Sequence, residues 1–290
     1  RSRWHCQSLT PTTSSFIRRR AGRALGGMAT IFGSFAAAGT VQGGREQPWE
    51  QSGLPASQVL ESAIWPAHFP LTPQHLSRLD ESDDSRFYVQ PRLVQHIDEY
   101  AVAALGEYYA EVLPRGGTVV DLMSSWTSHL AAGNGKDKSD GYFAHVSAVG
   151  MHGTELNANT ALHSYHVRDL NAQPTLDMYA DNSIDAIFCS VSVDYLANPL
   201  PVFEEIHRIL KPGGLVVFSW SNRMFPTKAI TAWREASEPA RLWICGSYFV
   251  YSVPNGFSKP QGVDISPRPG RSDPLYAVSA RKLSEGREEL

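Results

Sequence analysis

The feature that most constrains the fold is a regular alternation of strand-like and helix-like segments between residues 118 and 220. Residues 184–191 form a nearly continuous apolar run, typical of a strand that is buried on both faces of a sheet. Similar strands are predicted at residues 118–122, 143–151, 164–167 and 215–220, with helices at residues 156–162 and from Pro201 onward. Strands and helices that alternate in this way predict a parallel sheet wrapped by helices.

Other elements flank this alternation. Asp98 is expected to cap a helix before the first strand, and a short helix is expected after Thr72-Pro73. The turn at residues 211–214, KPGG, suits a type II turn. Near the C-terminus we predict an antiparallel hairpin of residues 247–251 and 275–280. Its core would contain a group of aromatic residues, for which a substrate cage is the alternative: Trp233, Trp243, Tyr248, Phe249 and Tyr251.

Charge is distributed unevenly along the chain. Residues 1–45 contain seven arginines and no acid, so all 29 Asp and Glu residues lie in the remainder. An acidic body is a poor non-specific binder of nucleic acid, which needs clustered Lys and Arg, so no nucleic-acid partner is expected. The three cysteines, Cys6, Cys189 and Cys245, are too widely spaced for a zinc pattern or a disulfide framework. We therefore expect no metal site and a reducing compartment.

The Arg-rich, acid-free composition of residues 1–45 is typical of an organellar transit peptide. The apolar run at residues 24–44 is similar to the core of an export signal, which favours a plastid over a mitochondrion; an unstructured Gly/Ala leader is the alternative. We expect four regions: a targeting leader at residues 1–45, a linker and N-terminal extension at 46–85, the α/β domain at 86–282 and a tail at 283–290.

A family resemblance rests mainly on residues 181–220, which read DNSIDAIFCSVSVDYLANPLPVFEEIHRILKPGGLVVFSW. This block resembles the fourth strand, the next helix and the R-x-L-K-P-G-G turn of class I S-adenosylmethionine-dependent methyltransferases, in the group called methyltransferase type 11. The resemblance implies a Rossmann-like, doubly wound, mostly parallel seven-stranded sheet with a C-terminal antiparallel hairpin. It also implies S-adenosyl-L-methionine as cofactor and a small molecule as methyl acceptor.

Two shorter segments resemble a subgroup of this family found in algae, plants and bacteria. They are DLMSSWTSHL at residues 121–130 and FYVQPRLVQHID at residues 87–98. The first departs from the usual D-x-G-x-G-x-G pattern, because Met123, Ser125 and Thr127 stand at the glycine positions. The acid expected at the end of the second strand is also missing, and Glu155 is the nearest carboxylate.

Carried over by position, the resemblance assigns cofactor contacts to the ends of the first four strands. Asp169 and Leu170 would contact the adenine, and Ser190 would lie beside the cofactor at the end of the fourth strand. The complete predicted set is Asp121, Met123, Ser124, Ser125, Trp126, His152, Glu155, Asp169, Leu170, Ser190 and Val191. Structural alternatives remain open: Asp121 as a turn cap, Asp169 as a surface acid and Ser190 as a core hydroxyl.

The substrate would contact residues on either side of this cofactor site. Residues 87–98 would form a lid or substrate wall, with a capped helix N-terminus as the alternative. The predicted substrate residues are Tyr88, Arg92, His96, Tyr195, Asn222 and Arg223. Methyl transfer from a sulfonium is a direct displacement that depends mainly on positioning, and it needs a base only when the acceptor must lose a proton. No catalytic residue is therefore assigned.

Two functions remain open. The first is an S-adenosylmethionine-dependent methyltransferase acting on a small molecule. The second, motivated by the missing glycines and acid, is a catalytically silent assembly factor or subunit in an organelle, associated peripherally with a membrane or complex. A nicotinamide dehydrogenase is disfavoured because no G-x-G-x-x-G follows a strand. A nucleic-acid methyltransferase is disfavoured because residues 190–194 read SVSVD and not Asn/Asp-Pro-Pro-Tyr.

Overall fold

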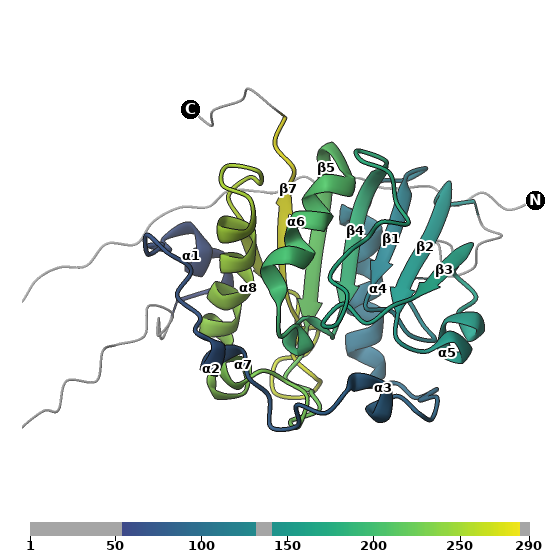
Figure 1. Ribbon diagram of the computed structural model, residues 1–290, viewed down its shortest axis with the longest axis horizontal. Coiled ribbons are helices and arrows are strands. Elements are labelled where there is room, and N and C mark those ends of the chain that lie inside the picture. Colours follow the sequence, from purple (N-terminus) through teal and green to yellow (C-terminus); the bar gives the residue numbers. More distant parts are fainter. Residues whose placement is uncertain (1–53, 132–140, 285–290) are drawn as a thin grey trace, which may run out of the picture. The chain divides into compact units, whose positions relative to one another are not determined.

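The computed structural model describes residues 54–131 and 141–284 (Figure 1). The expected leader, its organellar destination and the first part of the expected linker lie outside these residues. Within the described ranges, no helix is both long and apolar enough to cross a bilayer.

A seven-stranded sheet forms the centre of the fold, with the strand order β3-β2-β1-β4-β5-β7-β6. The strands are β1 (Thr118–Leu122), β2 (His145–Gly150), β3 (Ser164–Val167), β4 (Ile184–Ser190), β5 (Leu210–Trp220), β6 (Gln261–Asp264) and β7 (Tyr276–Arg281). The first five are paired in parallel, whereas β7 runs antiparallel to both β5 and β6. The predicted doubly wound, mostly parallel sheet with a C-terminal antiparallel pair is confirmed.

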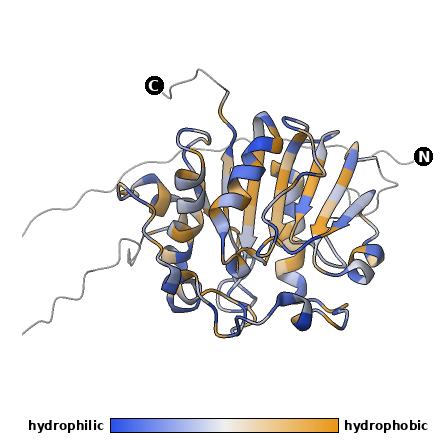
Figure 2. Cartoon of the chain, in the orientation of Figure 1, coloured by the Kyte–Doolittle hydropathy of each residue, from blue (hydrophilic) through white to orange (hydrophobic). Residues whose placement is uncertain are grey.

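Successive side chains of the central strands divide between two hydrophobic cores. On β4, Ile187 and Cys189 belong to one core and Ala186 and Phe188 to the other, because neighbouring residues of a strand point to opposite faces. Helices α6 (Pro199–Ile209) and α8 (Glu238–Ser252) cover one face, and α4 (Glu99–Val112) covers the other (Figure 1). Figure 2 shows that the strands between these layers are largely hydrophobic.

The smaller elements lie around this sheet. Their bounds are α1 (Ala56–Glu61), α2 (Pro73–Leu76), α3 (Asp84–Phe87), α5 (Gly153–Ala158), the 3-10 turn η2 (Val193–Tyr195) and α7 (Thr231–Glu235). The predicted cap of α4 is confirmed, because the Asp98 carboxylate accepts the Ala101 N–H at 2.9 Å. The predicted short helix after Thr72 is α2, which has Pro73 as its first residue.

The C-terminal hairpin was predicted with one wrong strand. Residues 247–251 belong to helix α8, and β6 is the strand that pairs with β7. Ser237 caps α8 by accepting the Ala240 N–H. Most of α8 is buried on all sides, so apolar residues do not follow the helical period and the run of aromatics looks strand-like. The predicted role as core residues holds for Trp233, Trp243, Tyr248 and Phe249, which are buried.

The segment expected to be a linker and extension packs into the domain from residue 56 onward. Val59 and Leu60 on α1 are fully buried. A Cβ at Gly246 of α8 would lie 2.6 Å from the Leu60 Cδ2, and one at Gly262 of β6 would lie 2.8 Å from the Ala56 carbonyl oxygen. Helix α1 therefore approaches β6 so closely that glycine is required at Gly262, whereas a side chain at Gly246 would displace the Leu60 side chain.

Replacing Leu60 by alanine should test this packing. We expect Leu60→Ala to lower the free energy of unfolding by about 2–4 kcal/mol, because it leaves a cavity between α1 and α8. Urea denaturation followed by circular dichroism measures the change. Ile64→Ala is the control, since Ile64 is 82% exposed and should change stability by less than about 0.5 kcal/mol. Equal effects for the two variants would contradict a packed α1.

Candidate functional site

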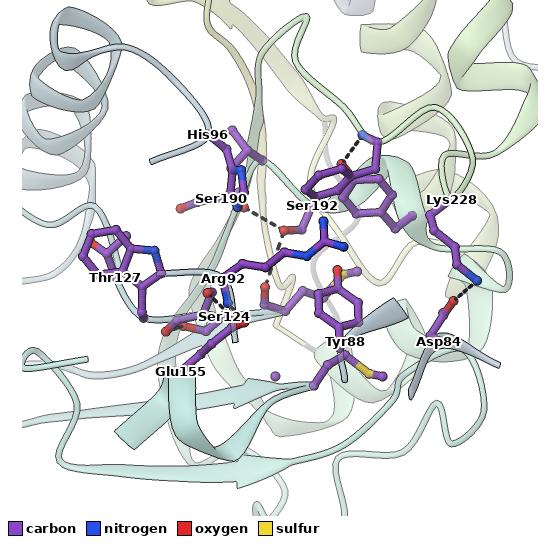
Figure 3. Close-up of a pocket in the computed structure, with 18 of the residues that line it drawn as sticks. Asp84, Tyr88, Arg92, His96, Ser124, Thr127, Glu155, Ser190, Ser192 and Lys228 are labelled. Carbon is purple, nitrogen blue, oxygen red and sulfur yellow. Dashed lines mark hydrogen bonds and ion pairs between the residues drawn. The ribbon is translucent and has the colours of Figure 1, made fainter. Parts of the chain in front are cut away.

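A cavity of about 290 Å³ lies at the carboxyl ends of the parallel strands (Figure 3). Asp121 reaches it from β1, Gly150 from β2 and Ser190 from β4, while Asp169 and Arg223 follow β3 and β5. Open α/β sheets bind their ligands at this edge. The remaining wall comes from residues 84–96, which precede α4 in the chain.

Residues 123–130, here called the first loop, turn without glycine. Met123 and His129 adopt positive φ values of 56° and 52°, which cost a non-glycine residue roughly 1–2 kcal/mol each. The Met123 side chain packs against the hydrophobic core on the α6–α8 face, and the Ser124 hydroxyl donates to Asp121 at 2.6 Å. Met123 thus packs against this core and also lines the cavity.

The first loop lies directly on the end of β2. The Ser124 N–H donates to the Val149 carbonyl at 2.8 Å. A Cβ at Gly150 would lie only 2.2 Å from the Ser124 carbonyl oxygen, so no side chain fits there. This contact explains why the acid that the family places at the end of the second strand is missing.

Glu155, in the first turn of α5, supplies a carboxylate to this part of the cavity. Its side chain is buried, and its two oxygens accept hydrogen bonds from the Arg92 main-chain N–H at 2.7 Å and the Ser125 hydroxyl at 2.6 Å. His152 does not line the cavity. Its Nδ1 accepts the Thr154 N–H and caps α5, so its predicted position at the cofactor is not the one observed.

The other side of the cavity is lined by the residues predicted to contact adenine. Asp169 accepts the Asn171 N–H through Oδ1 at 2.8 Å, and the hydrogen bonds of the described residues include none to its Oδ2. Leu170 is buried beside it. Further along the edge, the Ser190 hydroxyl lies 2.8 Å from the Tyr109 hydroxyl. Val191 has a φ of 45°, a strained conformation for a β-branched residue of the kind found at ligand sites.

Burial changes the protonation of two cavity residues. Burial raises the pKa of Asp121 to about 7, although hydrogen bonds from Ser124 and Ser128 oppose the shift. Burial also lowers the pKa of His129 to about 4, with a smaller contribution from His96. The His129 Nδ1 is enclosed and has no hydrogen-bond partner among the described residues. The cavity thus contains an imidazole that is neutral at pH 7.

Five of the six predicted substrate residues line the cavity: Tyr88, Arg92, His96, Tyr195 and Arg223. Asn222 does not, and its side-chain oxygen accepts a hydrogen bond from the Ser221 hydroxyl. Arg92 contacts an acid through its main chain, because its N–H donates to Glu155. Residues 87–98 are also tied to the first loop, since the Trp126 Nε1 donates to the Val94 carbonyl at 3.1 Å.

The other lining residues lie outside the predicted set, and most of them come from segments whose meeting depends on the folded chain. Lys228 and Phe225 follow β5, and Arg168 lies at the end of β3. These residues are Arg78, Asp84, Val94, Gln95, Thr127, His129, Gly150, Met151, Arg168, Asn171, Ser192, Met224, Phe225 and Lys228. Thr127 and His129 lie within the first loop, and Val94 and Gln95 lie within residues 87–98, so their place in these predicted segments was a signal that the sequence offered.

The contact between the first loop and β2 can be tested at Gly150. We expect Gly150→Ala to lower the free energy of unfolding by about 1–3 kcal/mol, because the new methyl group displaces the Ser124 carbonyl. Chemical denaturation measures it. Gly153→Ala is a matched control three residues away, where the nearest atom to a new Cβ is 3.5 Å distant. An unchanged stability for Gly150→Ala would mean that the first loop lies elsewhere.

The raised pKa of Asp121 predicts a specific pH dependence. Between its ordinary value of 3.8 and about 7, the folded protein holds a proton that the unfolded chain has released. The free energy of unfolding should therefore fall as pH rises through this window. Asp121→Asn removes this contribution, so the stability difference between variant and wild type should shift in the variant's favour from pH 4 to pH 7. Parallel stability curves in urea titrations would contradict the prediction.

Comparison with known proteins identifies part of the chain. A family model described as a methyltransferase domain matches residues 130–218. A malonyl-[acyl-carrier protein] O-methyltransferase of a Marinomonas strain is 38% identical over 53 residues, which are 18% of this chain and 20% of that protein. A biotin biosynthesis bifunctional protein of Teredinibacter turnerae is 32% identical over 79 residues, 27% of this chain and 13% of that protein. The chain thus matches a fifth or less of these relatives.

Among solved structures, an S-adenosylmethionine-dependent methyltransferase from Mesorhizobium loti superposes with a TM-score of 0.44 at 17% identity, covering 63% of this chain and all of that one. The family match begins at Leu130, the end of the first loop, and extends through β2, β3 and β4 into β5. The cofactor of this family is S-adenosyl-L-methionine. Residues 130–218 thus match a methyltransferase domain of the class I, S-adenosylmethionine-dependent type.

Proposed function

We propose that this protein transfers a methyl group from S-adenosyl-L-methionine to a small-molecule acceptor. The observation that carries the proposal is the open carboxylate of Asp169 beside buried Leu170, at the sheet edge where open α/β sheets bind their ligands. A carboxylate at this point accepts a hydrogen bond from an amino group such as that of adenine. The apolar side chain next to it covers an aromatic ring face.

The cavity residues fit the cofactor at its adenosine end. Each Glu155 oxygen accepts one protein hydrogen bond and has a second lone pair, which suffices for a ribose hydroxyl. Met151 lines the cavity near Leu170 and adds apolar surface. The volume of about 290 Å³ lies at the lower end of the range for small-molecule sites, roughly 300–1,000 Å³. The first loop would hold the amino-acid end through main-chain groups and serine hydroxyls.

The chain's own contribution to the reaction is positioning and the placement of neutral proton acceptors. Bound in the cavity, S-adenosyl-L-methionine supplies an electrophilic methyl group. Burial lowers the pKa of His96, and the nearby Arg92 lowers it further, although Glu155 opposes the shift. His96 and His129 are thus both held neutral, and a neutral imidazole accepts a hydrogen bond or a proton from an acceptor group. Both side chains line the cavity.

A second proposal is supported by the first loop. The Ser124 carbonyl lies where a side chain of residue 150 would stand, and both Glu155 oxygens are already engaged. A site closed in this way also suits a catalytically silent methyltransferase-like subunit or assembly factor. The acid-free, Arg-rich residues 1–45 support a location for either function in a plastid or mitochondrion.

Calorimetric titration of the full chain with S-adenosylmethionine and S-adenosylhomocysteine separates the two proposals. We expect binding, and Asp169→Ala should weaken it by about 1–3 kcal/mol because one hydrogen bond to the ligand is lost. Asp181→Ala is the control, since Asp181 lies outside the cavity and pairs with Arg208 on the surface. An absence of both binding heat and thermal shift would exclude the enzyme and leave the assembly factor.

A further inference from the structure

The cationic side chains of the cavity differ in whether a carboxylate neutralises them. Five cations line it: Arg78, Arg92, Arg168, Arg223 and Lys228. Arg78 and Lys228 both bind Asp84, at 2.8 and 3.1 Å. In the described part of the chain, Arg92 is the one of the five that forms no ion pair.

The two other cations are paired at the rim. Arg168 binds Asp177 at 2.5 Å, and Arg223 binds Asp273 at 2.7 Å. An arginine that is partly removed from water beside neutralised neighbours keeps its full charge. Arg92 therefore keeps a positive charge to which no carboxylate binds directly, and such a guanidinium favours an anionic ligand group.

Two aromatic rings hold the Arg92 guanidinium in place. Its Cζ lies 4.0 Å from the centroid of the Phe87 ring and 4.8 Å from that of Phe225. Its Nη2 also lies 3.4 Å from the Phe87 carbonyl oxygen, to which it donates. Stacking of this kind uses the faces of the guanidinium plane and leaves N–H groups at its edge for an oxyanion.

A second donor lies beside this guanidinium. Figure 3 shows the Arg92 side chain extending across the cavity toward Tyr88. The pKa of Tyr88 is raised strongly, mainly by burial and further by the nearby Asp84, so its hydroxyl stays protonated. The hydrogen bonds of the described residues include none from this hydroxyl. Arg92 and Tyr88 thus offer three or more N–H and O–H groups to one ligand group.

We propose that the methyl acceptor carries a carboxylate or phosphate group, and that Arg92 binds this oxyanion with Tyr88 as a second donor. The inference rests on the proposed methyltransferase function and adds the chemical class of the acceptor. A planar guanidinium binds either oxyanion through two parallel hydrogen bonds.

The position of Arg92 favours the acceptor over the cofactor as the source of the anion. Phe225 follows β5, and the Tyr195 ring, which follows β4, lies 6.0 Å from it. The residues that fit adenosine follow β2 and β3, on the other side of β1 in the sheet order. The guanidinium therefore lies on the β5 side of the cavity, away from Asp169.

Calorimetric titration of the full chain with malonate and with inorganic phosphate, each in the absence and presence of S-adenosylhomocysteine, tests the proposal. Wild type should bind either anion with the same affinity in the absence and presence of saturating S-adenosylhomocysteine. Arg92→Gln should weaken anion binding by roughly tenfold to a hundredfold, the usual loss for a charged hydrogen-bonded contact. Arg92→Lys keeps the charge but loses the paired N–H groups of the planar guanidinium, so it should retain part of the affinity.

Arg115→Gln is the matched control, because Arg115 also stacks on an aromatic ring, that of Tyr142, but lies outside the cavity. It should change anion affinity by less than about threefold. Equal losses in Arg92→Gln and Arg115→Gln, or no anion binding by wild type, would overturn the proposal. Displacement of malonate by S-adenosylhomocysteine would overturn it too, since Arg92 would then serve the cofactor's own carboxylate. The proposed methyltransferase function is tested separately: if wild type binds the anions but not S-adenosylhomocysteine, that function fails while the anion site remains.

Discussion

The contact between the first loop and the end of β2 determines the geometry of the whole cavity. With the Ser124 carbonyl against Gly150, the loop is held at the sheet edge by main-chain packing. The sequence after β1 then needs no glycine, because Met123 and His129 themselves adopt the positive φ values that the turns require. A site that family members build with flexible glycines is built here from a tightly packed, side-chain-bearing loop.

A small set of polar contacts attaches the rest of the cavity wall to this loop. Trp126 binds the Val94 carbonyl. At the start of α4, the Asp98 N–H donates to the Asp273 carboxylate at 2.9 Å, and the Asp273 N–H donates to the Asp98 carboxylate at 2.6 Å. Residues 87–98 are largely exposed, so hydrogen bonds and ring contacts hold them, with little hydrophobic burial.

The sequence predicted the parallel part of the fold well, because strands such as residues 184–190 are apolar on both faces and bounded by clear turns. It failed for residues 247–251, because a helix buried on every side loses the periodicity that distinguishes helix from strand. The site was predicted in part. Residues at strand ends, such as Asp169 and Ser190, follow from topology. His152 was misplaced because capping of α5 and ligand binding favour the same residue type at a helix start.

Contacts between side chains that are far apart in the sequence could not be predicted from residue spacing. Phe225 and Phe87 are far apart in the chain, yet both lie against Arg92. The pairing of Asp84 with Lys228 is of the same kind. Without these contacts the sequence shows several arginines near a cavity, and only their partners distinguish a structural arginine from one that is available to a ligand.

The Glu155 carboxylate has a consequence for how separate parts of the cavity influence one another. One of its oxygens binds the main chain of Arg92 and the other binds Ser125. A ligand hydroxyl that donates a hydrogen bond to this carboxylate would contact a group that is already bonded to the first loop and to residue 92. A displacement of Glu155 would therefore disturb both neighbours together. The two halves of the cavity are joined through a single buried acid.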